Sequence, residues 1–258
     1  VLLANYNGTA DDYYTPLRGI RKLCKNGVIY ARGCHVTEDE STWRYGEHPM
    51  REAIIAAKHS DVVIMCMGIN PQIEGEEALH KGFKGDRDSI EMPLIQQKLF
   101  KEIRKTNKPI IFVNISGSCI DLSLPDKEAD AVIQCFYPGA LGGIALADII
   151  FGRVSPSGRL PVTFYKDTTD LPDFEDYSME NRTYRFFKGK PVYSFGFGLS
   201  YADVEEKWID ENTVEISNKS DIDTDYSVLK FQKKPDMKLL DFKKVKLKGN
   251  SKKIVKFS

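Results

Sequence analysis

The sequence predicts an α/β protein with a mainly parallel β-sheet and helices on both of its faces, followed by a small all-β sandwich. Short, largely apolar runs, such as residues 62–67 and 110–115, alternate with helical patterns along the first part of the chain. Beyond about residue 202, short segments of alternating polarity separated by turn residues replace the helical patterns. We therefore expect an α/β domain over residues 1–201 and a short β domain over residues 202–258.

The predicted helices have clear boundary signals. Thr15 suits the N-cap and Pro16 the first turn of a helix that ends at Asn26-Gly27. Apolar residues at helical spacing follow Pro49 and Pro93 in the same way. In chain order we expect a helix from residue 16, a strand at 28–30, a helix at 49–60, a strand at 62–67, a helix from 93, strands at 110–115 and 131–136, a helix at 142–151, and β segments at 214–216, 228–231 and 254–257.

Charge and apolar patterning exclude two classes of partner. Lys plus Arg and Asp plus Glu both number 37 among the 258 residues, so no net charge draws the chain to nucleic acid or to an anionic membrane. The longest apolar run, residues 61–68, is far shorter than the roughly 20 residues that span a bilayer. We therefore expect no nucleic acid and no membrane among the partners, and a neutral ligand agrees with this charge balance.

Histidines and cysteines give no sign of a metal or a cofactor. None of the four histidines pairs at metal-ligand spacing, and the sequence has no Cys-x-x-Cys. The five cysteines are odd in number and thinly spread, and Cys66 and Cys135 lie in apolar runs, so we expect reduced thiols in the core. Such cysteines suit the cytoplasm as well as a secreted or periplasmic protein, so the compartment is left open.

The loop after residue 67 contains the best candidate site. Ligands of open α/β sheets bind beyond the carboxyl ends of the strands, and this loop has Glu74, Glu76 and Glu77 within four positions. Carboxylates this close repel one another, and a partly desolvated one has a raised pKa, as a general acid near neutral pH requires. A solvated acidic loop would explain the same residues. Asp86 and Arg87, further along the loop, fit a surface ion pair or an arginine that orders the loop.

Two other loops lack the spacing of known catalytic or phosphate-binding motifs. Ser116 and Ser118 follow a strand without the Gly-x-Ser-x-Gly pattern of a nucleophile elbow, so we interpret them as turn residues. Residues 139–143 lie between a strand and a helix but lack the Gly-x-Gly-x-x-Gly spacing of a dinucleotide turn. An independent nucleotide-binding protein is therefore disfavoured.

A series of short motifs runs in order along the chain. They are Asn5-Tyr6-Asn7-Gly8, Tyr30-Ala31-Arg32-Gly33-Cys34, the Glu74 loop with Gly85-Asp86-Arg87, Tyr137-Pro138-Gly139 with Gly142-Gly143, Phe151-Gly152, residues 156–164, 176–179 and 182–186, and Phe195-Gly196-Phe197-Gly198-Leu199-Ser200-Tyr201. In this order they resemble the C-terminal region of glycoside hydrolase family 3. The stretches at 176–179 and 182–186 look more like the β-xylosidase branch than other branches. Residues 217–220 and 239–245 look like the fibronectin type III-like domain that follows in many members.

The resemblance implies a site shared between two domains. Family members cleave terminal β-linked sugars with retention, using an aspartate nucleophile on an N-terminal barrel and a glutamate acid/base on a loop of the α/β domain. Alignment with the family pattern gives Glu74 as the acid/base, with Glu77 and then Glu76 as alternatives, and Asp86 and Arg87 as residues that shape the loop or border the sugar. The barrel and the first strand of the sandwich are expected outside this chain, and the β domain is shorter than usual. Leu141 stands where the family often has an acidic residue.

We therefore expect the C-terminal part of a retaining β-glycosidase of the β-xylosidase or β-glucosidase type, inactive without its nucleophile domain. Its expected partners are an oligosaccharide or aryl β-glycoside and the N-terminal barrel of the same enzyme, with a homodimer left open. The sequence does not discriminate xylose from glucose or arabinose. A catalytically silent carbohydrate-binding or interaction module of the same fold is the alternative, and it differs in giving Glu74 no chemical role.

Overall fold

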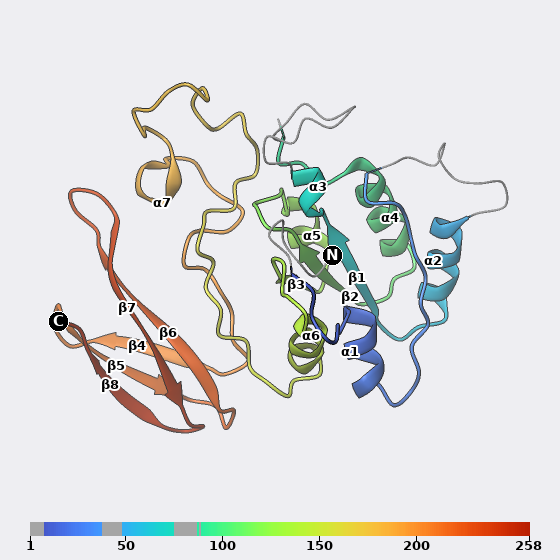
Figure 1. Ribbon diagram of the computed structural model, residues 1–258. Helices are drawn as coiled ribbons and strands as arrows, with labels where there is room; N and C mark the ends of the chain where they lie inside the picture. Colours follow the sequence, from blue (N-terminus) through green and yellow to red (C-terminus); the bar gives the residue numbers. More distant parts are fainter. Residues whose placement is uncertain (1–7, 38–47, 75–86, 88) are drawn as a thin grey trace. The chain divides into compact units, whose positions relative to one another are not determined.

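The computed structural model describes residues 8–37, 48–74, 87 and 89–258 (Figure 1). The chain divides into two compact units, which we call the α/β unit (Val1–Ala147 with Phe164–Thr168) and the β unit (Asp148–Thr163 with Thr169–Ser258). Much of the segment before residue 202 thus groups with the β unit, and the domain boundary between residues 201 and 202 stays a prediction.

A three-stranded parallel sheet forms the centre of the α/β unit. Its strands β1 (Val63–Gly68), β2 (Ile110–Ile115) and β3 (Ala131–Gln134) are ordered β1-β2-β3, with Val63 opposite Ile110 and Ile111 opposite Ala131. Strand β2 is in the middle, and its Phe112 and Val113 are fully buried. The three apolar runs expected to form parallel strands do so, and their carboxyl ends lie at one edge of the sheet (Figure 1).

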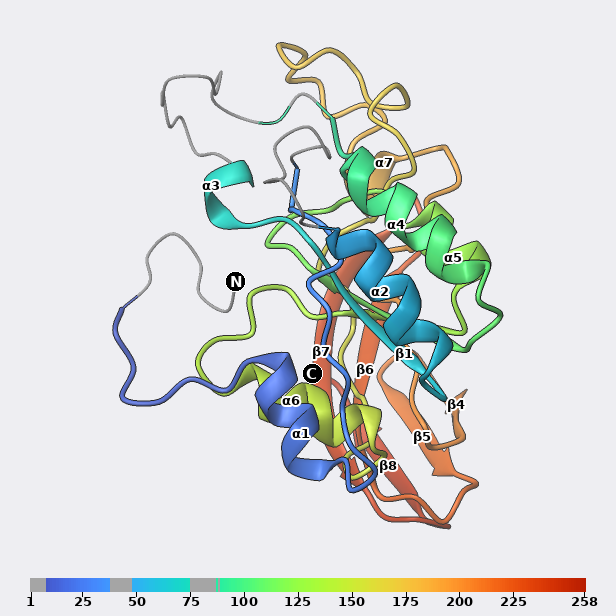
Figure 2. The same ribbon diagram turned by 90° about the vertical axis from the view of Figure 1, so that its right-hand side faces the viewer.

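Helices cover the sheet on both sides. Figure 2 shows α2 (Pro49–Lys58) and α4 (Leu94–Arg104) on one side of β1, and α1 (Pro16–Leu23) and α6 (Gly142–Ile150) on the other. Helix α1 is capped as predicted, since Thr15 Oγ1 accepts a hydrogen bond from the Arg18 amide. Helices α5 (Ser123–Glu128) and α3 (Pro71–Glu74) are too short to show helical periodicity and were not expected.

The strand expected at residues 28–30 is absent. This segment has no ladder partner in the part of the chain that the structure describes, and Ile29 and Tyr30 are 57% and 62% exposed. Ile29 and Tyr30 therefore lie exposed outside any strand, because β propensity needs a neighbouring strand to form a ladder.

The expectation of core cysteines was also wrong in part. All five thiols are free, but four are only partly buried and Cys66 is exposed. Cys66 lies on β1, at one edge of the sheet, where fewer neighbours cover a side chain than on the central strand.

The β unit contains two antiparallel sheets. Strands β4 (Val204–Trp208), β5 (Thr213–Asn218) and β8 (Lys252–Lys256) form one sheet, and β6 (Thr224–Gln232) pairs with β7 (Lys238–Leu247) in the other. One buried cluster draws on both sheets: Val214, Ile216, Val228, Leu247, Val255 and Phe257. A further short helix, α7 (Thr183–Phe186), precedes these strands.

Candidate active site

The loops that follow the three parallel strands meet at the carboxyl edge of the sheet. Strand β1 continues into α3, which ends at Glu74; β2 is followed by Ser118, and β3 by Tyr137. The turn after β1 needs glycine, because Gly68 has a φ of 129° and a Cβ there would lie 2.0 Å from the Ile115 carbonyl oxygen. The parallel topology thus brings together side chains that are far apart in the sequence.

Glu74 is held at the end of α3 by a capped first turn. The amides of Ile73 and Glu74 both donate to the Asn70 carbonyl at 3.0 Å, and the Asn70 side-chain oxygen also accepts from the Ile73 amide at 3.0 Å. Asparagine is one of the residues best suited to this capping role. The backbone that carries Glu74 is therefore anchored directly after β1.

Both oxygens of the Glu74 carboxyl accept hydrogen bonds from the neighbouring loops. Oε1 accepts from the backbone amide of Ser118 at 2.7 Å and from its hydroxyl at 2.8 Å. Oε2 accepts from the hydroxyl of Tyr137 at 2.5 Å. The partners are 44 and 63 positions away in the sequence, so only the fold brings them to Glu74.

The backbone around this carboxyl allows little space. Gly117 lies so close that a Cβ there would be 2.6 Å from Cε2 of Tyr137 and 2.7 Å from Oε2 of Glu74. Phe136, just before Tyr137, has a positive φ of 51°, a conformation that is strained for an aromatic residue. Such strain persists only where surrounding contacts fix the backbone, and here it directs the β3 loop that carries Tyr137.

The surroundings of Tyr137 change the pKa of its phenol. Partial burial raises the pKa of its phenol well above the usual value, and the hydrogen bond to Glu74 and the charge of Glu74 raise it further. The phenol is therefore neutral in the physiological range and keeps its proton as a donor to Glu74.

A buried polar network lies under Ser118. Asn114 and Ser116 are fully buried; the Asn114 amide donates to the Ser116 hydroxyl at 2.9 Å and to the Gln134 side-chain oxygen at 2.5 Å. The Ser116 hydroxyl in turn donates to the Ser118 carbonyl at 2.8 Å. Hydrogen-bonded groups of this kind rigidify the interior, and this network fixes the ends of β2 and β3 relative to one another.

Gln96 of α4 fixes the end of β1 in a similar way. Its side-chain oxygen accepts from the Gly68 amide at 2.9 Å, and its amide donates to the Gly68 carbonyl at 2.6 Å. Gln96 is 2% exposed, so both bonds are shielded from water. All three strand ends are thus positioned by buried polar side chains.

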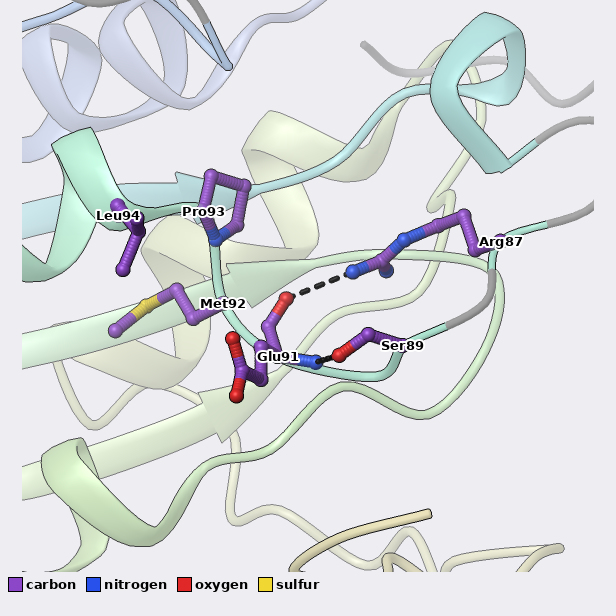
Figure 3. A pocket seen from close by; sticks show the side chains of 6 residues that line it. All are labelled: Arg87, Ser89, Glu91, Met92, Pro93 and Leu94. Carbon is purple, nitrogen blue, oxygen red and sulfur yellow. Dashed lines mark hydrogen bonds between the residues drawn. The ribbon is translucent and has the colours of Figure 1, made fainter. Parts of the chain in front are cut away.

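Arg87 borders the same region. Its side chain is partly buried and donates to the Glu91 carbonyl at 2.7 Å, beyond the carboxyl ends of the strands (Figure 3). Burial lowers the pKa of Arg87, while the charge of Glu74 acts in the opposite direction. Arg87 lines an open pocket of about 340 Å³ with residues of the segment that leads into α4, namely Ser89, Glu91, Met92, Pro93 and Leu94 (Figure 3).

Of the residues predicted for the site, the structure describes Glu74 and Arg87 and places both at the carboxyl edge of the sheet. Glu76, Glu77 and Asp86 lie outside the described residues, so the choice among the three glutamates stays a prediction. Sequence reasoning missed Ser118, interpreted only as a turn residue, and gave Tyr137 no role. The rule that ligands bind at strand ends identified both loops, but no local pattern connects either residue with Glu74.

The described residues contain no group of three or more His, Cys, Asp or Glu side chains placed to hold a metal ion. Within the same residues, every helix is too short or too polar to cross a membrane.

Comparisons with known proteins agree on one family. Residues 1–201 match the family described as glycosyl hydrolase family 3 C-terminal domain. The chain is 48% identical over 158 residues to a xylan 1,4-beta-xylosidase of Xylanibacter ruminicola, covering 60% of this chain and 18% of that protein. It is 35% identical over 210 residues to a probable beta-D-xylosidase 7 of Arabidopsis thaliana, covering 78% of this chain and 26% of that one.

Solved structures give the same result. A GH3 exo-beta-xylosidase in complex with a xylobiose aziridine activity-based probe superposes with a TM-score of 0.83 at 26% identity, over 98% of this chain and 37% of that one. A β-glucosidase of Erythrobacter marinus gives a TM-score of 0.81 at 25% identity, over 100% and 39% of the two chains. The chain therefore spans only a fifth to two fifths of the length of these relatives. It belongs to glycoside hydrolase family 3, and its residues 1–201 are a C-terminal domain of that family of β-xylosidases and β-glucosidases.

Proposed function

We propose that this chain is the C-terminal part of a retaining, exo-acting β-glycosidase that releases terminal β-linked xylose or glucose from oligosaccharides, with Glu74 as its general acid/base. One observation carries the proposal. The Glu74 carboxyl lies at the carboxyl edge of a parallel sheet, held by donors from two neighbouring strand loops. This edge is where open α/β sheets bind their ligands.

The chemistry proposed for Glu74 has two steps. In the first, Glu74 gives its proton to the glycosidic oxygen while the bond from that oxygen to the anomeric carbon breaks and a carboxylate nucleophile bonds to that carbon. In the second, Glu74 takes a proton from a water molecule as that water displaces the nucleophile. A carboxyl group fixed in place suits both steps, because the same oxygen must reach the leaving group and then the water.

The nucleophile is proposed to lie on an N-terminal barrel of the same enzyme. Retaining glycosidases place their two carboxyl groups about 5 to 5.5 Å apart, so the Glu74 loop must border the sugar bound on the barrel. On this proposal the chain alone is inactive, and Arg87, beside Glu74, borders the sugar together with Asp86. We further propose that residues 202–258 form a fibronectin type III-like module with a structural role.

The choice of xylose or glucose follows the relatives. Several proteins similar to this chain are named β-xylosidases, and one that is 30% identical over 222 residues is named a periplasmic beta-glucosidase of Salmonella typhimurium. A neutral sugar also agrees with the balanced charge of the chain.

The test is turnover of nitrophenyl β-xyloside and β-glucoside by the full-length enzyme that contains this chain. Wild type is compared with Glu74→Gln, with azide added as a replacement nucleophile for the second step. We expect Glu74→Gln to lose roughly 10²- to 10⁴-fold in turnover, the range typical of general acid/base groups. Azide should restore turnover, with a glycosyl azide as the product, and the preferred sugar is identified in the same experiment.

Two outcomes would contradict the proposal. Activity that survives in Glu74→Gln moves the acid/base role to Glu77 or Glu76. A wild-type enzyme that is inert on every sugar tried favours the silent carbohydrate-binding module instead. Glu180→Gln is the matched control, because Glu180 is an exposed glutamate of the β unit whose carboxylate pairs with Lys188 on the surface.

A further inference from the structure

The two oxygens of the Glu74 carboxyl have different surroundings. Oε1 accepts two hydrogen bonds, from the amide and the hydroxyl of Ser118, and these occupy both of its lone pairs. Oε2 accepts one bond, from the hydroxyl of Tyr137 at 2.5 Å, and keeps one lone pair without a partner among the described residues. Only Oε2 can therefore carry a proton without first breaking a hydrogen bond.

We infer that Ser118 and Tyr137 are positioning residues that assign separate roles to the two oxygens of Glu74. Ser118 saturates Oε1, so that Oε2 carries the transferred proton, and Tyr137 stabilises the charge that remains on Oε2 when the proton leaves. This inference rests on the proposed role of Glu74 as the acid/base and specifies which atom reacts.

The proton balance of the first step explains why Tyr137 would matter. As the glycosidic bond breaks, the leaving oxygen keeps the bonding electron pair and receives the Oε2 proton, and a negative charge appears on the carboxylate. A hydrogen bond from a neutral phenol to a carboxylate is stronger than one to a neutral carboxylic acid. The contact therefore strengthens during proton transfer, as an interaction that lowers a barrier must.

The geometry of the site keeps Tyr137 in this position. Gly117 packs against its ring, and the positive φ of Phe136 sets the direction of the loop that precedes it. Its phenol is held neutral by partial burial and by the nearby carboxylate, so it remains a donor throughout the cycle. Ser118 is placed by the buried Ser116 hydroxyl, which donates to its carbonyl.

If Ser118 and Tyr137 only held Glu74 in place, the same hydrogen bonds would be present, but the kinetic effect of removing them would differ. Misplacing Glu74 would slow both steps, including the second step, in which the leaving group is already gone, whereas loss of charge stabilisation on Oε2 slows only the first step, in which the proton leaves that oxygen. A 2,4-dinitrophenolate leaves without protonation, and a phenolate or a sugar alkoxide does not. The first step is therefore fast on a 2,4-dinitrophenyl glycoside, so kcat on this substrate reports the second step and separates the two roles.

The experiment compares Tyr137→Phe with wild type in the full-length enzyme, using the phenyl and 2,4-dinitrophenyl glycosides of its preferred sugar. We expect kcat/KM to fall about tenfold or more on the phenyl glycoside, since a hydrogen bond to a charged group is worth about that much. On the dinitrophenyl glycoside, both kcat/KM and kcat should fall less than about twofold. Ser118→Ala should show the same selectivity with a smaller loss of about threefold, because the backbone amide still donates to Oε1.

Matched controls remove hydrogen bonds of the same kind elsewhere. Tyr201→Phe deletes a hydroxyl that donates to the Ile149 carbonyl at 2.9 Å, and Ser60→Ala deletes one that donates to the Ala56 carbonyl at 2.8 Å. Both should leave the two substrates unaffected. Ser118→Ala also serves as the second test if Tyr137→Phe does not fold.

Each outcome either supports or overturns the inference about Ser118 and Tyr137. A kcat of Tyr137→Phe that falls more than about twofold on the dinitrophenyl glycoside, or an unchanged kcat/KM on the phenyl glycoside, would overturn the inference while a loss in Glu74→Gln leaves the acid/base assignment standing. Wild-type activity of Glu74→Gln on the phenyl glycoside would overturn the proposed function and this inference with it. Selective loss on the phenyl glycoside in Tyr137→Phe, and to a smaller degree in Ser118→Ala, supports it.

Discussion

Two buried asparagines, one in each unit, form hydrogen-bond networks that end on different kinds of group. In the β unit, Asn218 donates to the carbonyls of Ile222 and Lys248 and accepts from the amide and hydroxyl of Ser220. Every one of these partners belongs to the turns that surround it. In the α/β unit, Asn114 donates to Ser116, which leads through Ser118 to Glu74 at the surface.

The comparison separates a polar network that stabilises the fold from one that positions a candidate reacting group. The Asn218 network closes on backbone groups that would otherwise be left without partners, which is what burial of a turn requires. The Asn114 network ends on a carboxylate at the edge where ligands bind, and one lone pair of its Oε2 has no partner among the described residues. Mutations in the two networks should accordingly affect different quantities, stability in the first and activity in the second.

The largest effect is expected from Gly117→Ala in the α/β unit. Its new Cβ would come within 2.7 Å of both Tyr137 and Glu74, so one of these side chains must move. Because even a 1 Å displacement of reacting groups can cost about 10²-fold, we expect a loss of about that size in kcat/KM, measured on a phenyl glycoside. Gly158→Ala is the control, since no atom lies within 4 Å of a Cβ there. Unchanged activity in Gly117→Ala would mean that the contacts around Glu74 do not matter for catalysis.

A smaller effect, on stability alone, is expected from Asn218→Ala. The change leaves the carbonyls of Ile222 and Lys248 and the amide of Ser220 without this partner, and each such group costs up to about 1–3 kcal/mol where it is shielded from water. Because the exposed ends of these turns regain water, we expect a total loss of about 2–3 kcal/mol in the free energy of unfolding, measured by urea denaturation. The kcat of the folded fraction should equal that of wild type. A lowered kcat would show that the β unit influences the chemistry.

The smallest effect concerns a surface ion pair of the β unit. Lys248 and the Gly249 amide donate to the Asp223 carboxylate, and the lysine hydrogen bond is the main reason why the pKa of Asp223 lies below its usual value of about 4. A depressed pKa adds stability above the unfolded pKa and loses it as the pH falls through the folded value. Lys248→Ala should therefore lower the melting temperature slightly at pH 7, and the difference should shrink as the pH falls through the lowered pKa of Asp223. A difference that persists in acid would exclude this pair as its cause.

Much of the α/β unit could be predicted from the sequence, because its signals are local. The runs at 62–67 and 110–115 are largely apolar, and Thr15 and Pro16 show where a helix begins. The same reasoning failed for β4 and β7, whose sequences VEEKW and KLLDFKKVKL carry mostly charged, exposed side chains. These strands form because they pair with β5 and β6, and such pairing cannot be recognised within one segment.

The candidate site was predictable to a similar extent. Topology alone indicates that the loops after the strands meet, and Glu74 was chosen from one of these loops by resemblance to the family pattern. Its partners could not be predicted, because Ser118 is 44 positions away and Tyr137 is 63 positions away. Their contacts depend on the tight backbone at Gly117 and Phe136, and neither residue type signals a donor to a carboxylate.

The most direct test of the account is the leaving-group dependence of Glu74→Gln in the full-length enzyme. The ratio of kcat/KM on a 2,4-dinitrophenyl glycoside to that on the corresponding phenyl glycoside is measured for wild type, Glu74→Gln and the control Glu180→Gln. We predict that this ratio rises at least about 10²-fold in Glu74→Gln alone, because only the phenyl leaving group needs a proton from this side chain. An unchanged ratio in Glu74→Gln would contradict the claim that Glu74 is the acid/base.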